Sequence, residues 1–527
     1  MFLRKIFFVF LLSCIFVFST TAQFVRLNND ISYYYETNLN FNTVRHYTIK
    51  PYEKDYYKSV SFQNIFSKNK LFNENLLEIK NKNTDFILNP VITSSFYNDF
   101  SDKRFFSDLR AGINIQSSYK NKLFISSDIF YSEAGFPSYY DNLINKFGIV
   151  PHFGKYIKRT NSKTEFYSWT GDITYQVNKY ISLSGGRGKY FLGNGYRSLF
   201  LSDNSNAFPY VKAEVTIWKI KYLWMFTKLS DVNLSSGVNT NILYDKAAFL
   251  HYFSLNITKR INFDFFETVI TNPYDSNGRR VSYDAVYFNP VIFYRPTEFY
   301  KGTSDNSLMG LALNVRLFKS TFLYSQFILD DILISSLRDK SGWWGNKFGL
   351  QAGIKVYNLF HVSGLFARGE INAVRPYTYS HGEAYVNQGI ANLNYGNFRQ
   401  ELAHPLGANF AEGIALIRYV KGRFSAKAKI ISAKKGEDIN DTVSYGGNIY
   451  KSYRLRPDDY GIKFLQGEIS NIQIFDLGFS YLINPDYGLL FNVGFYYRKK
   501  TNQFIEKKSQ IIYFGLSTNI FNSSFDY

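Results

Sequence analysis

The chain has 527 residues, with 61 Lys and Arg against 42 Asp and Glu, which gives a formal net charge of +19 at pH 7. Its single cysteine, Cys14, excludes an intrachain disulfide, and beyond the first residues no stretch approaches the ~18 uninterrupted apolar residues of a membrane-spanning helix. The 44 Tyr and 52 Phe, beside only 12 Pro and a mean hydropathy of −0.22, suit strands that have one face in lipid and the other in water.

The N-terminus has the pattern of a secretory signal peptide. MFLRK supplies a basic start, IFFVFLLSCIFVF an apolar run and STTAQ a small-residue exit, which predicts that residues 1–22 are cleaved off after Ala22. Two alternatives stay open: an anchor helix, for which the apolar run is short, and lipid attachment at Cys14. Cleavage removes the only cysteine together with Arg4 and Lys5, so the mature chain stays strongly basic.

Residues 23–85 lack the rhythm of the rest of the chain. They include YYYETNLNFNTVRHYTIKPY and the more helix-compatible NKLFNENLLEIKNK. We expect a small periplasmic or plug element here, with one short helix.

From residue 86 onward, apolar and polar residues alternate. In TEFYSWTGDITYQV (164–177), Tyr167, Trp169, Ile173 and Tyr175 share one face and polar residues occupy the other. Because successive strand residues point to opposite sides, this pattern predicts a strand between an apolar and a polar medium. The alternation recurs in 211–217, 309–317, 475–483 and 489–497, and the last expected strand spans 511–521.

The strands are long, and short turns and longer loops connect them alternately. Strands of ~9 to 13 residues exceed the usual ~5 to 6, and a soluble β-sandwich or β-helix would have to bury all the outward aromatic side chains. We therefore predict an all-β fold, a transmembrane, antiparallel outer-membrane β-barrel over residues 86–527, with about 18 strands, or 16 as the alternative. The predicted location is the cell outer membrane.

Motifs for nucleotides, metals or catalysis are weak. GGRGKYFLGNG (185–195) has the glycine density of a phosphate loop, but the glycines end a strand and do not open a helix. Glycines on an inner barrel wall are expected to let a loop or plug pack closely. The six histidines have no metal-ligand spacing, so we expect no metal and no cofactor. A barrel-embedded hydrolase would need His381 or His404, for both of which a hydrogen bond within a loop is the alternative.

Aromatic and polar side chains gather in SGWWGNKFG (341–349) and RPYTYSHGE (375–383). Flat rings stack on the apolar face of a sugar, while its hydroxyls and carboxylates pair with polar groups. The predicted glycan-binding residues are Trp343, Trp344, Lys347, Arg375, Tyr377, Tyr379 and His381, joined by Gln326, Asp330, Arg368 and Glu370 on the inner wall and by Arg295, Glu298, Asp305 and Asn306 in RPTEFYKGTSDN. The alternatives are an interfacial aromatic belt, side chains that only brace the lumen, and an ordinary polar loop.

Several long blocks resemble a known group of proteins. NPVIFYRPTEFYKGTSDNSLMGLALNVRLF, LYSQFILDD, GWWGNKFGLQAGIK, VRPYTYSH and LAHPLGANF resemble the RemB group of gliding motility proteins of the Bacteroidetes, a group that is itself similar to the Wzi family of capsule assembly outer-membrane proteins. GRGKYFLGNGYRSLFLSDNSNAFPY and KLFNENLLEIK extend the likeness over residues 70 to 420. The resemblance implies a barrel of about 18 strands with a helical plug that holds capsular polysaccharide, although this chain offers only one convincing short helix.

The patterns predict a non-enzymatic barrel, and the resemblance implies that it binds or organises capsular or exopolysaccharide and supports gliding motility or surface spreading. Its expected partners are outer-membrane lipid, an acidic polysaccharide and proteins of the gliding or capsule machinery. An exported basic chain meets these counter-charges and not nucleic acid. A porin-like transport channel lined by Arg295, Glu298, Asp330 and Arg368 is the alternative, and a hydrolase is the third hypothesis.

Overall fold

The structure is a computed structural model, and it describes residues 28–36, 46–52, 62, 69–160, 163–233, 242–273, 279, 282–290, 294, 296, 305–382, 392–518, 521–523 and 525–526. The predicted signal peptide lies outside the described residues, and so do Arg295 and Glu298 of the predicted site.

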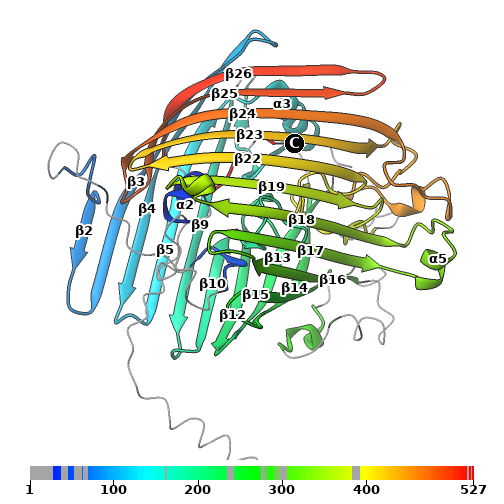
Figure 1. Cartoon of the computed structure of the whole chain (residues 1–527), viewed down its shortest axis with the longest axis horizontal. Helices are drawn as coiled ribbons and strands as arrows, with labels where there is room; N and C mark the ends of the chain where they lie inside the picture. The colour runs from blue at the N-terminus through cyan, green and yellow to red at the C-terminus, as the bar shows by residue number, and fades with distance from the viewer. Residues whose placement is uncertain are drawn as a thin grey trace, which may run out of the picture.

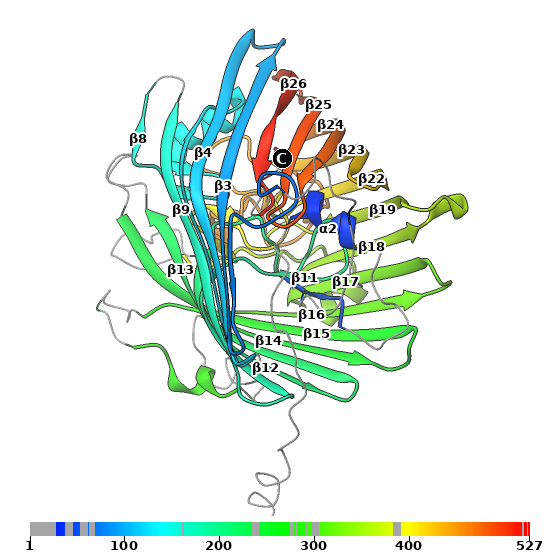
Figure 2. The same cartoon turned by 90° about the vertical axis from the view of Figure 1, so that its left-hand side faces the viewer.

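Within the described residues, 18 long strands close into an antiparallel β-barrel (Figures 1 and 2). Each long strand pairs with the next one along the chain, and β26 closes the ring by pairing with β3, where Phe514 lies opposite Phe96. The strands are β3 (Thr84–Asp99), β4 (Arg104–Tyr119), β5 (Leu123–Ala134), β9 (Thr164–Gln176), β10 (Ile181–Gly188), β12 (Phe208–Ile217), β13 (Ile220–Asn233), β14 (Ile242–Asn256), β15 (Ile261–Thr271), β16 (Asn306–Arg316), β17 (Thr321–Asp331), β18 (Lys347–Tyr357), β19 (Leu365–Val374), β22 (Phe410–Lys421), β23 (Phe424–Glu437), β24 (Glu468–Asn484), β25 (Leu489–Thr501) and β26 (Glu506–Thr518). The predicted outer-membrane barrel and its strand number are confirmed.

The two ends of the barrel differ. One end, the short-turn rim, has the tight turns 120–122, 177–180, 218–219, 257–260, 317–320, 358–364, 422–423 and 485–488. The other end, the long-loop rim, has the connections that follow β5, β10, β15, β17, β19 and β23. Short turns face the periplasm and long loops face outward in barrels of this class, which gives the molecule its orientation.

The outer wall is apolar, as the alternation predicts. In β9, Tyr167, Trp169 and Ile173 are exposed on the outside, whereas Phe166 and Ser168 are buried inside. Exposed apolar surface costs roughly 25 cal/mol per Å² in water, so a wall of such residues fits a lipid environment. Among the described helices, none is long and apolar enough to cross a membrane.

Several described segments lie inside the ring of strands, and three of them matter most for the lumen. The first holds α2 (Asn29–Glu36) and β1 (Ile49–Lys50), the second is the connection 189–207 with β11 (Phe191–Leu192), here called the inner loop, and the third is the C-terminal segment 521–526. β1 pairs with β11, and Figure 2 shows both α2 and β11 within the ring. The buried core therefore lies in the lumen, where the ring of Phe200 stacks on Phe266 at 5.0 Å.

The helix expected in NKLFNENLLEIKNK is absent. Residues 70–73 form a turn, and β2 (Leu77–Lys80) pairs with the start of β3, because the backbone of an unfinished strand edge offers hydrogen bonds that outweigh a weak helical preference. The N-terminal helix is α2, where the side-chain oxygen of Asn28 accepts hydrogen bonds from the N–H groups of Asp30 and Ile31 at 2.8 and 3.0 Å.

Shorter elements complete the described chain. They are α3 (Ser138–Phe147), β6 (Ile149–Val150), β7 (Gly154–Lys155), β8 (Lys158–Arg159), η3 (Ala285–Phe288), α5 (Ile334–Arg338), η4 (Leu359–His361), β20 (Gly396–Asn397), β21 (Gln400–Glu401) and η5 (Tyr453–Leu455). The last strand, expected to span 511–521, is described to Thr518. Residues 519 and 520 lie outside the described residues, and the amide group of Asn522 donates to Asp203 in the inner loop.

Candidate functional site

A cavity of about 840 Å³ opens at the long-loop rim between α3, the segment 399–406 and the ends of β23, β25 and β26. We call it the vestibule. The side chains that line it include Tyr139, Lys146, Phe147, Arg399, Glu401, Lys435, Glu437, Asp438, Asp441, Tyr450, Arg498, Lys500 and Lys507. Its volume lies in the ~300–1,000 Å³ range of ligand sites.

Helix α3 forms one wall of the vestibule. It follows Pro137 and ends at Gly148, which adopts φ 68° and donates its N–H to the carbonyl of Ile144, a left-handed termination that glycine favours. Asp141 ties the helix to the rest of the barrel through ion pairs with Arg104 and, at 3.0 Å, with Arg159. The helix buries Ile144 and presents Tyr139 to the cavity.

The vestibule carries a positive balance, because six basic and four acidic side chains line it. Two guanidinium groups lie over aromatic rings: Arg498 over Tyr139 at 4.2 Å, and Arg399 over Tyr450 at 5.0 Å. The ammonium of Lys500 pairs with Glu437 at 2.6 Å. This stacking holds the two planar guanidinium groups in place.

The net charge of the vestibule depends on pH through the carboxyl group of Glu401. Burial raises the pKa of this carboxyl to about 7, against the opposing effect of the Lys435 ammonium. At neutral pH, Glu401 therefore lies between its charged and uncharged forms.

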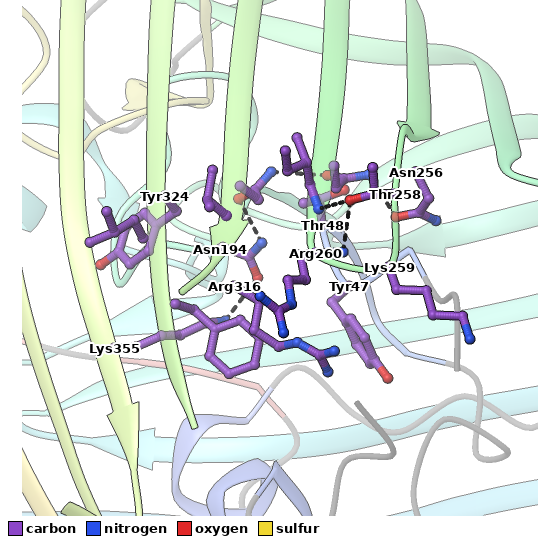
Figure 3. A pocket seen from close by; sticks show the side chains of 16 residues that line it. Tyr47, Thr48, Asn194, Asn256, Thr258, Lys259, Arg260, Arg316, Tyr324 and Lys355 are labelled. Carbon is purple, nitrogen blue, oxygen red and sulfur yellow. Dashed lines mark hydrogen bonds between the residues drawn. The ribbon is translucent and has the colours of Figure 1, made fainter. Parts of the chain in front are cut away.

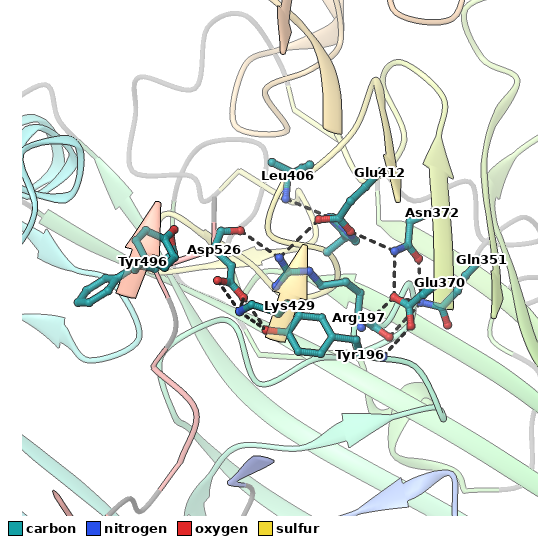
Figure 4. Close-up of polar contacts among 12 residues, drawn as sticks. Tyr196, Arg197, Gln351, Glu370, Asn372, Leu406, Glu412, Lys429, Tyr496 and Asp526 are labelled. Atoms are coloured by element: carbon teal, nitrogen blue, oxygen red, sulfur yellow. Dashed lines mark hydrogen bonds and ion pairs between the residues drawn. The ribbon is translucent and has the colours of Figure 1, made fainter. Parts of the chain in front are cut away.

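A buried polar network ties the inner loop and the C-terminal segment to the barrel wall (Figure 4). The carboxylate of Glu370 accepts the backbone N–H groups of Tyr196 and Arg197 at 2.6 and 3.1 Å. Arg197 donates to the backbone carbonyl of Asp526 at 3.0 Å, and Lys429 pairs with the Asp526 carboxylate at 2.7 Å. Charge-assisted bonds of this kind fix both segments inside the lumen.

The predicted residues of the inner wall hold these internal segments. Gln326 accepts the N–H of Leu199 at 2.8 Å, and its amide group donates to the carbonyl of Leu192 at 3.0 Å. Glu370 belongs to the network above, and Arg368 is buried beside it on β19. These contacts match the bracing alternative, and a role of these residues in glycan binding stays a prediction.

Asp330 and Lys347 also face inward. The Asp330 carboxylate accepts the N–H of Tyr379 at 2.8 Å and lies 3.5 Å from the Lys347 ammonium. Tyr379 is buried, and its hydroxyl donates to the carbonyl of Leu199 at 2.8 Å. The Lys347 ammonium also lies 5.3 Å from the ring of Trp344. These predicted residues are therefore buried near the long-loop ends of β17 and β18, and they do not line the vestibule.

Some of the predicted aromatic residues form one cluster at the long-loop rim. The ring of Trp344 stacks on Tyr453 at 4.7 Å and lies 4.2 Å from the Arg456 guanidinium and 6.2 Å from Tyr377. The Tyr377 hydroxyl donates to the carbonyl of Ser444 at 2.8 Å. The protein itself therefore occupies much of the Trp344 surface.

The remaining predicted residues of this rim are partly exposed or bound within loops. Trp343 and His381 are half-buried, and the ring of His381 lies 6.1 Å from Tyr453. The Nε of Arg375 donates to the carbonyl of Asn346 at 2.8 Å.

Of RPTEFYKGTSDN (295–306), only Pro296, Asp305 and Asn306 are described. Asp305 accepts the hydroxyl of Tyr287 at 2.9 Å, and the amide group of Asn306 donates to the carbonyl of Leu393 at 2.8 Å. Both residues therefore fix connections of the rim.

His404 is buried with both ring nitrogens engaged. Nε2 lies 2.7 Å from the Glu412 carboxylate, and Nδ1 accepts the N–H of Leu406 at 3.1 Å. A nucleophile would find no free nitrogen to receive its proton. Among the described residues, no group of three or more His, Cys, Asp or Glu could hold a metal ion.

Sequence reasoning missed the residues of the vestibule. Lys435, Arg399, Arg498 and Tyr450 come from four separate segments. The basic pairs in ISAKKGE (431–437) and YYRKKT (496–501) were the available signal, since both stand where a strand reaches the long-loop rim.

A second cavity, of about 70 Å³, opens at the short-turn rim (Figure 3). Its lining includes Lys259, Arg260, Arg316 and Lys355, and the Lys355 ammonium donates to Asn194 at 2.9 Å. This volume is far below the ~300 Å³ at which ligand sites begin, so the vestibule is the better candidate for a sugar chain.

Comparison with known proteins supports the fold. No protein-family model and no curated protein sequence matches the chain. Among solved structures, the chain is similar to Wzi, an outer-membrane protein involved in group 1 capsule assembly in Escherichia coli and described as a carbohydrate-binding β-barrel, with 12% identity over 94% of this chain and 100% of that chain and a TM-score of 0.53. OccAB2 of Acinetobacter baumannii (8% identity, 82% and 97% coverage, TM-score 0.44) and OprD of Pseudomonas aeruginosa (11%, 86% and 97%, 0.42) also match.

At such low identity, the likeness to Wzi shows a shared barrel fold. The predicted relation to the RemB group has no counterpart in the sequence comparisons and stays a prediction.

Proposed function

We propose that this outer-membrane barrel holds an acidic capsular or exopolysaccharide at the cell surface, without breaking or forming bonds in it. The observation that carries the proposal is the vestibule, a cavity of about 840 Å³ at the long-loop rim with six basic side chains and aromatic rings. The fold similarity to the Wzi barrel supports the same proposal.

The chemistry of the vestibule suits a chain of uronic acids. Arg399 and Arg498 are stacked on tyrosine rings, so their planar groups lose little freedom when they bind a carboxylate. Lys435 adds a point charge to the vestibule and acts electrostatically on Glu401. Sugar hydroxyls would pair with the carboxylates and amides of the 438–448 loop.

Attachment also explains the filled lumen. The inner loop, α2 and the C-terminal segment occupy the space that a channel would need, and the predicted channel residue Asp330 accepts a hydrogen bond from Tyr379. A filled barrel can still anchor a polymer in the membrane.

We also propose how the protein reaches the outer membrane and what it supports there. The chain would be exported with cleavage of residues 1–22, with residues 23–85 serving as a periplasmic or plug element ahead of the barrel. The retained polysaccharide would then act with capsule or gliding machinery, and would support spreading over surfaces.

Deletion of the gene tests this function. We expect cells without the protein to shed polysaccharide that wild-type cells retain, and to spread less on agar. Complementation with the Lys435→Gln, Arg399→Gln variant is expected to leave shedding high, whereas the Lys340→Gln, Lys463→Gln variant, altered in exposed loops outside the vestibule, restores retention. Unchanged retention and spreading in the deletion strain would contradict the proposal.

A further inference from the structure

Most turns of the short-turn rim are basic. Five neighbouring turns read KNK (120–122), VNKY (177–180), WK (218–219), ITKR (257–260) and LFKS (317–320). Each has at least one Lys or Arg and none has an acidic residue. Among all the described turns of this rim, only 485–488 contains a carboxylate, that of Asp486.

In three of these turns, one lysine lies against the ring of an adjacent aromatic residue. The ammonium of Lys120 lies 5.2 Å from the ring of Tyr119, that of Lys179 4.8 Å from Tyr180, and that of Lys219 4.9 Å from Trp218. In the fifth turn Phe318 precedes Lys319. Trp218 is 79% exposed and Phe318 71% exposed, so these rings face outward from the barrel.

The position of these pairs relative to the apolar wall indicates their surroundings. The outward residues Leu311 and Leu313 of β16 lead directly to Leu317 and Phe318, all of them exposed. An aromatic ring at the edge of an apolar band lies at the level where lipid chains meet headgroups. A lysine beside that ring extends its ammonium further outward, to the level of the phosphates.

The opposite rim lacks this pattern. Its two described short turns are 100–103, where Asp102 accompanies Lys103, and 502–505, which has no charged residue. The uniform charge is therefore a feature of one end of the barrel and does not follow from the basic composition of the chain as a whole.

We propose that the short-turn rim binds the headgroups of anionic phospholipids, such as phosphatidylglycerol, in the leaflet that surrounds it. The cations belong to separate hairpins that follow this edge of the wall. Lys120, Lys179 and Lys219 lie beside aromatic rings, so whatever contacts those rings also contacts them. Lipid meets that condition at every turn, and an anionic headgroup supplies the missing counter-charge. The glycan-binding proposal does not depend on this one, since the two sites lie at opposite rims.

The experiment uses the full chain reconstituted in vesicles that mix phosphatidylcholine with brominated phosphatidylglycerol. Bromine quenches tryptophan fluorescence on contact, and Trp218 lies in the turn 218–219 of the short-turn rim. The test variant is Lys179→Gln, Lys259→Gln, Lys319→Gln, because the ammonium groups of these three lysines make no hydrogen bond or ion pair with other described residues. The matched control is Lys103→Gln, Lys340→Gln, Lys463→Gln, three cations of the long-loop rim.

We expect the wild-type protein and the control to prefer phosphatidylglycerol over phosphatidylcholine several-fold at low salt, and to lose most of that preference in 1 M salt. The test variant loses three of the seven cations in the five turns. It is expected to prefer phosphatidylglycerol clearly less than the control does, while it still migrates as a folded barrel in gels. The proposal is overturned if the wild-type protein shows no preference, or if the test variant keeps it. If the basic turns bind an acidic protein and not lipid, the wild-type protein shows no preference between the two lipids.

Discussion

At the scale of single residues, the inner wall shows how closely the lumen is packed. A Cβ atom on Gly310 of β16 would lie closer than 3.0 Å to the ring of Phe200 in the inner loop. A Cβ atom on Gly413 of β22 would meet its nearest atom, the carbonyl oxygen of Ser432, at 4.0 Å. Gly310 therefore leaves room for the Phe200 ring, whereas a methyl group on Gly413 would meet no close neighbour.

Replacement of Gly310 by alanine is therefore expected to destabilise the protein by about 1–3 kcal/mol, because the added methyl group displaces the Phe200 ring in a packed core. Thermal unfolding in detergent measures this change as a lower Tm. Gly413→Ala is the matched control and leaves the Tm within a degree or two of the wild-type value. Equal Tm values for the two variants would show that the inner loop does not pack against β16.

The pKa of Glu401 predicts how glycan binding in the vestibule depends on pH. Its pKa of about 7 lies above the ordinary value of a glutamate, so the neutral form dominates below pH 7 and the negative form above it. Uronates and lysines keep their charges across this range. Affinity for an acidic glycan should therefore fall as the pH rises from 6 to 8, as the vestibule gains a negative charge.

Titration calorimetry at several pH values measures this effect with polygalacturonate as the probe. The Glu401→Gln variant is expected to keep the low-pH affinity throughout, since its amide stays neutral. A pH dependence that survives in this variant would assign the titration to another group.

At the scale of elements, the C-terminal segment acts as an internal strap. The hydroxyls of Tyr139 and Tyr496 donate to the backbone carbonyl of Phe525 at 2.9 and 2.6 Å, and Asp526 pairs with Lys429 at 2.7 Å. The segment thereby joins α3 to β23 and β25 across the inside of the barrel.

Removal of residues 519–527 is expected to weaken the closure of the lumen. The wild-type protein should conduct little current across a planar bilayer, because three segments fill its interior, whereas the truncated protein should show discrete openings. The Asp526→Asn variant, which keeps the length of the segment but loses its charge, is expected to open less often. A wild-type protein with a steady open pore would favour the transport alternative.

The same elements show what the sequence could predict. The strands follow from an alternation between adjacent residues, so TEFYSWTGDITYQV was sufficient to predict β9 and its exposed Tyr167. The filling of the lumen depends on pairs far apart in the chain, such as Gln326 and Leu199, which are separated by 127 positions. The vestibule likewise combines Arg399, Lys435 and Arg498 from different strands and loops, so no single stretch of sequence has its pattern.

At the scale of the whole molecule, the barrel has two differently charged ends and a filled interior. Most turns of the short-turn rim are basic, and the long-loop rim opens into a vestibule with basic and acidic groups. Such a molecule is suited to hold a polymer outside the membrane while it is fixed in the lipid. The proposed function requires that the vestibule bind an acidic glycan.

Binding of polygalacturonate to the purified full chain tests that claim most directly, with neutral dextran as the reference polymer. We expect the wild-type protein and the Lys340→Gln, Lys463→Gln control to bind polygalacturonate and not dextran. The Lys435→Gln, Arg399→Gln variant should bind at least tenfold more weakly, since each charge-assisted hydrogen bond contributes roughly 1.5–3 kcal/mol. Equal affinities of this variant and the wild-type protein, or equal binding of the two polymers, would contradict the account.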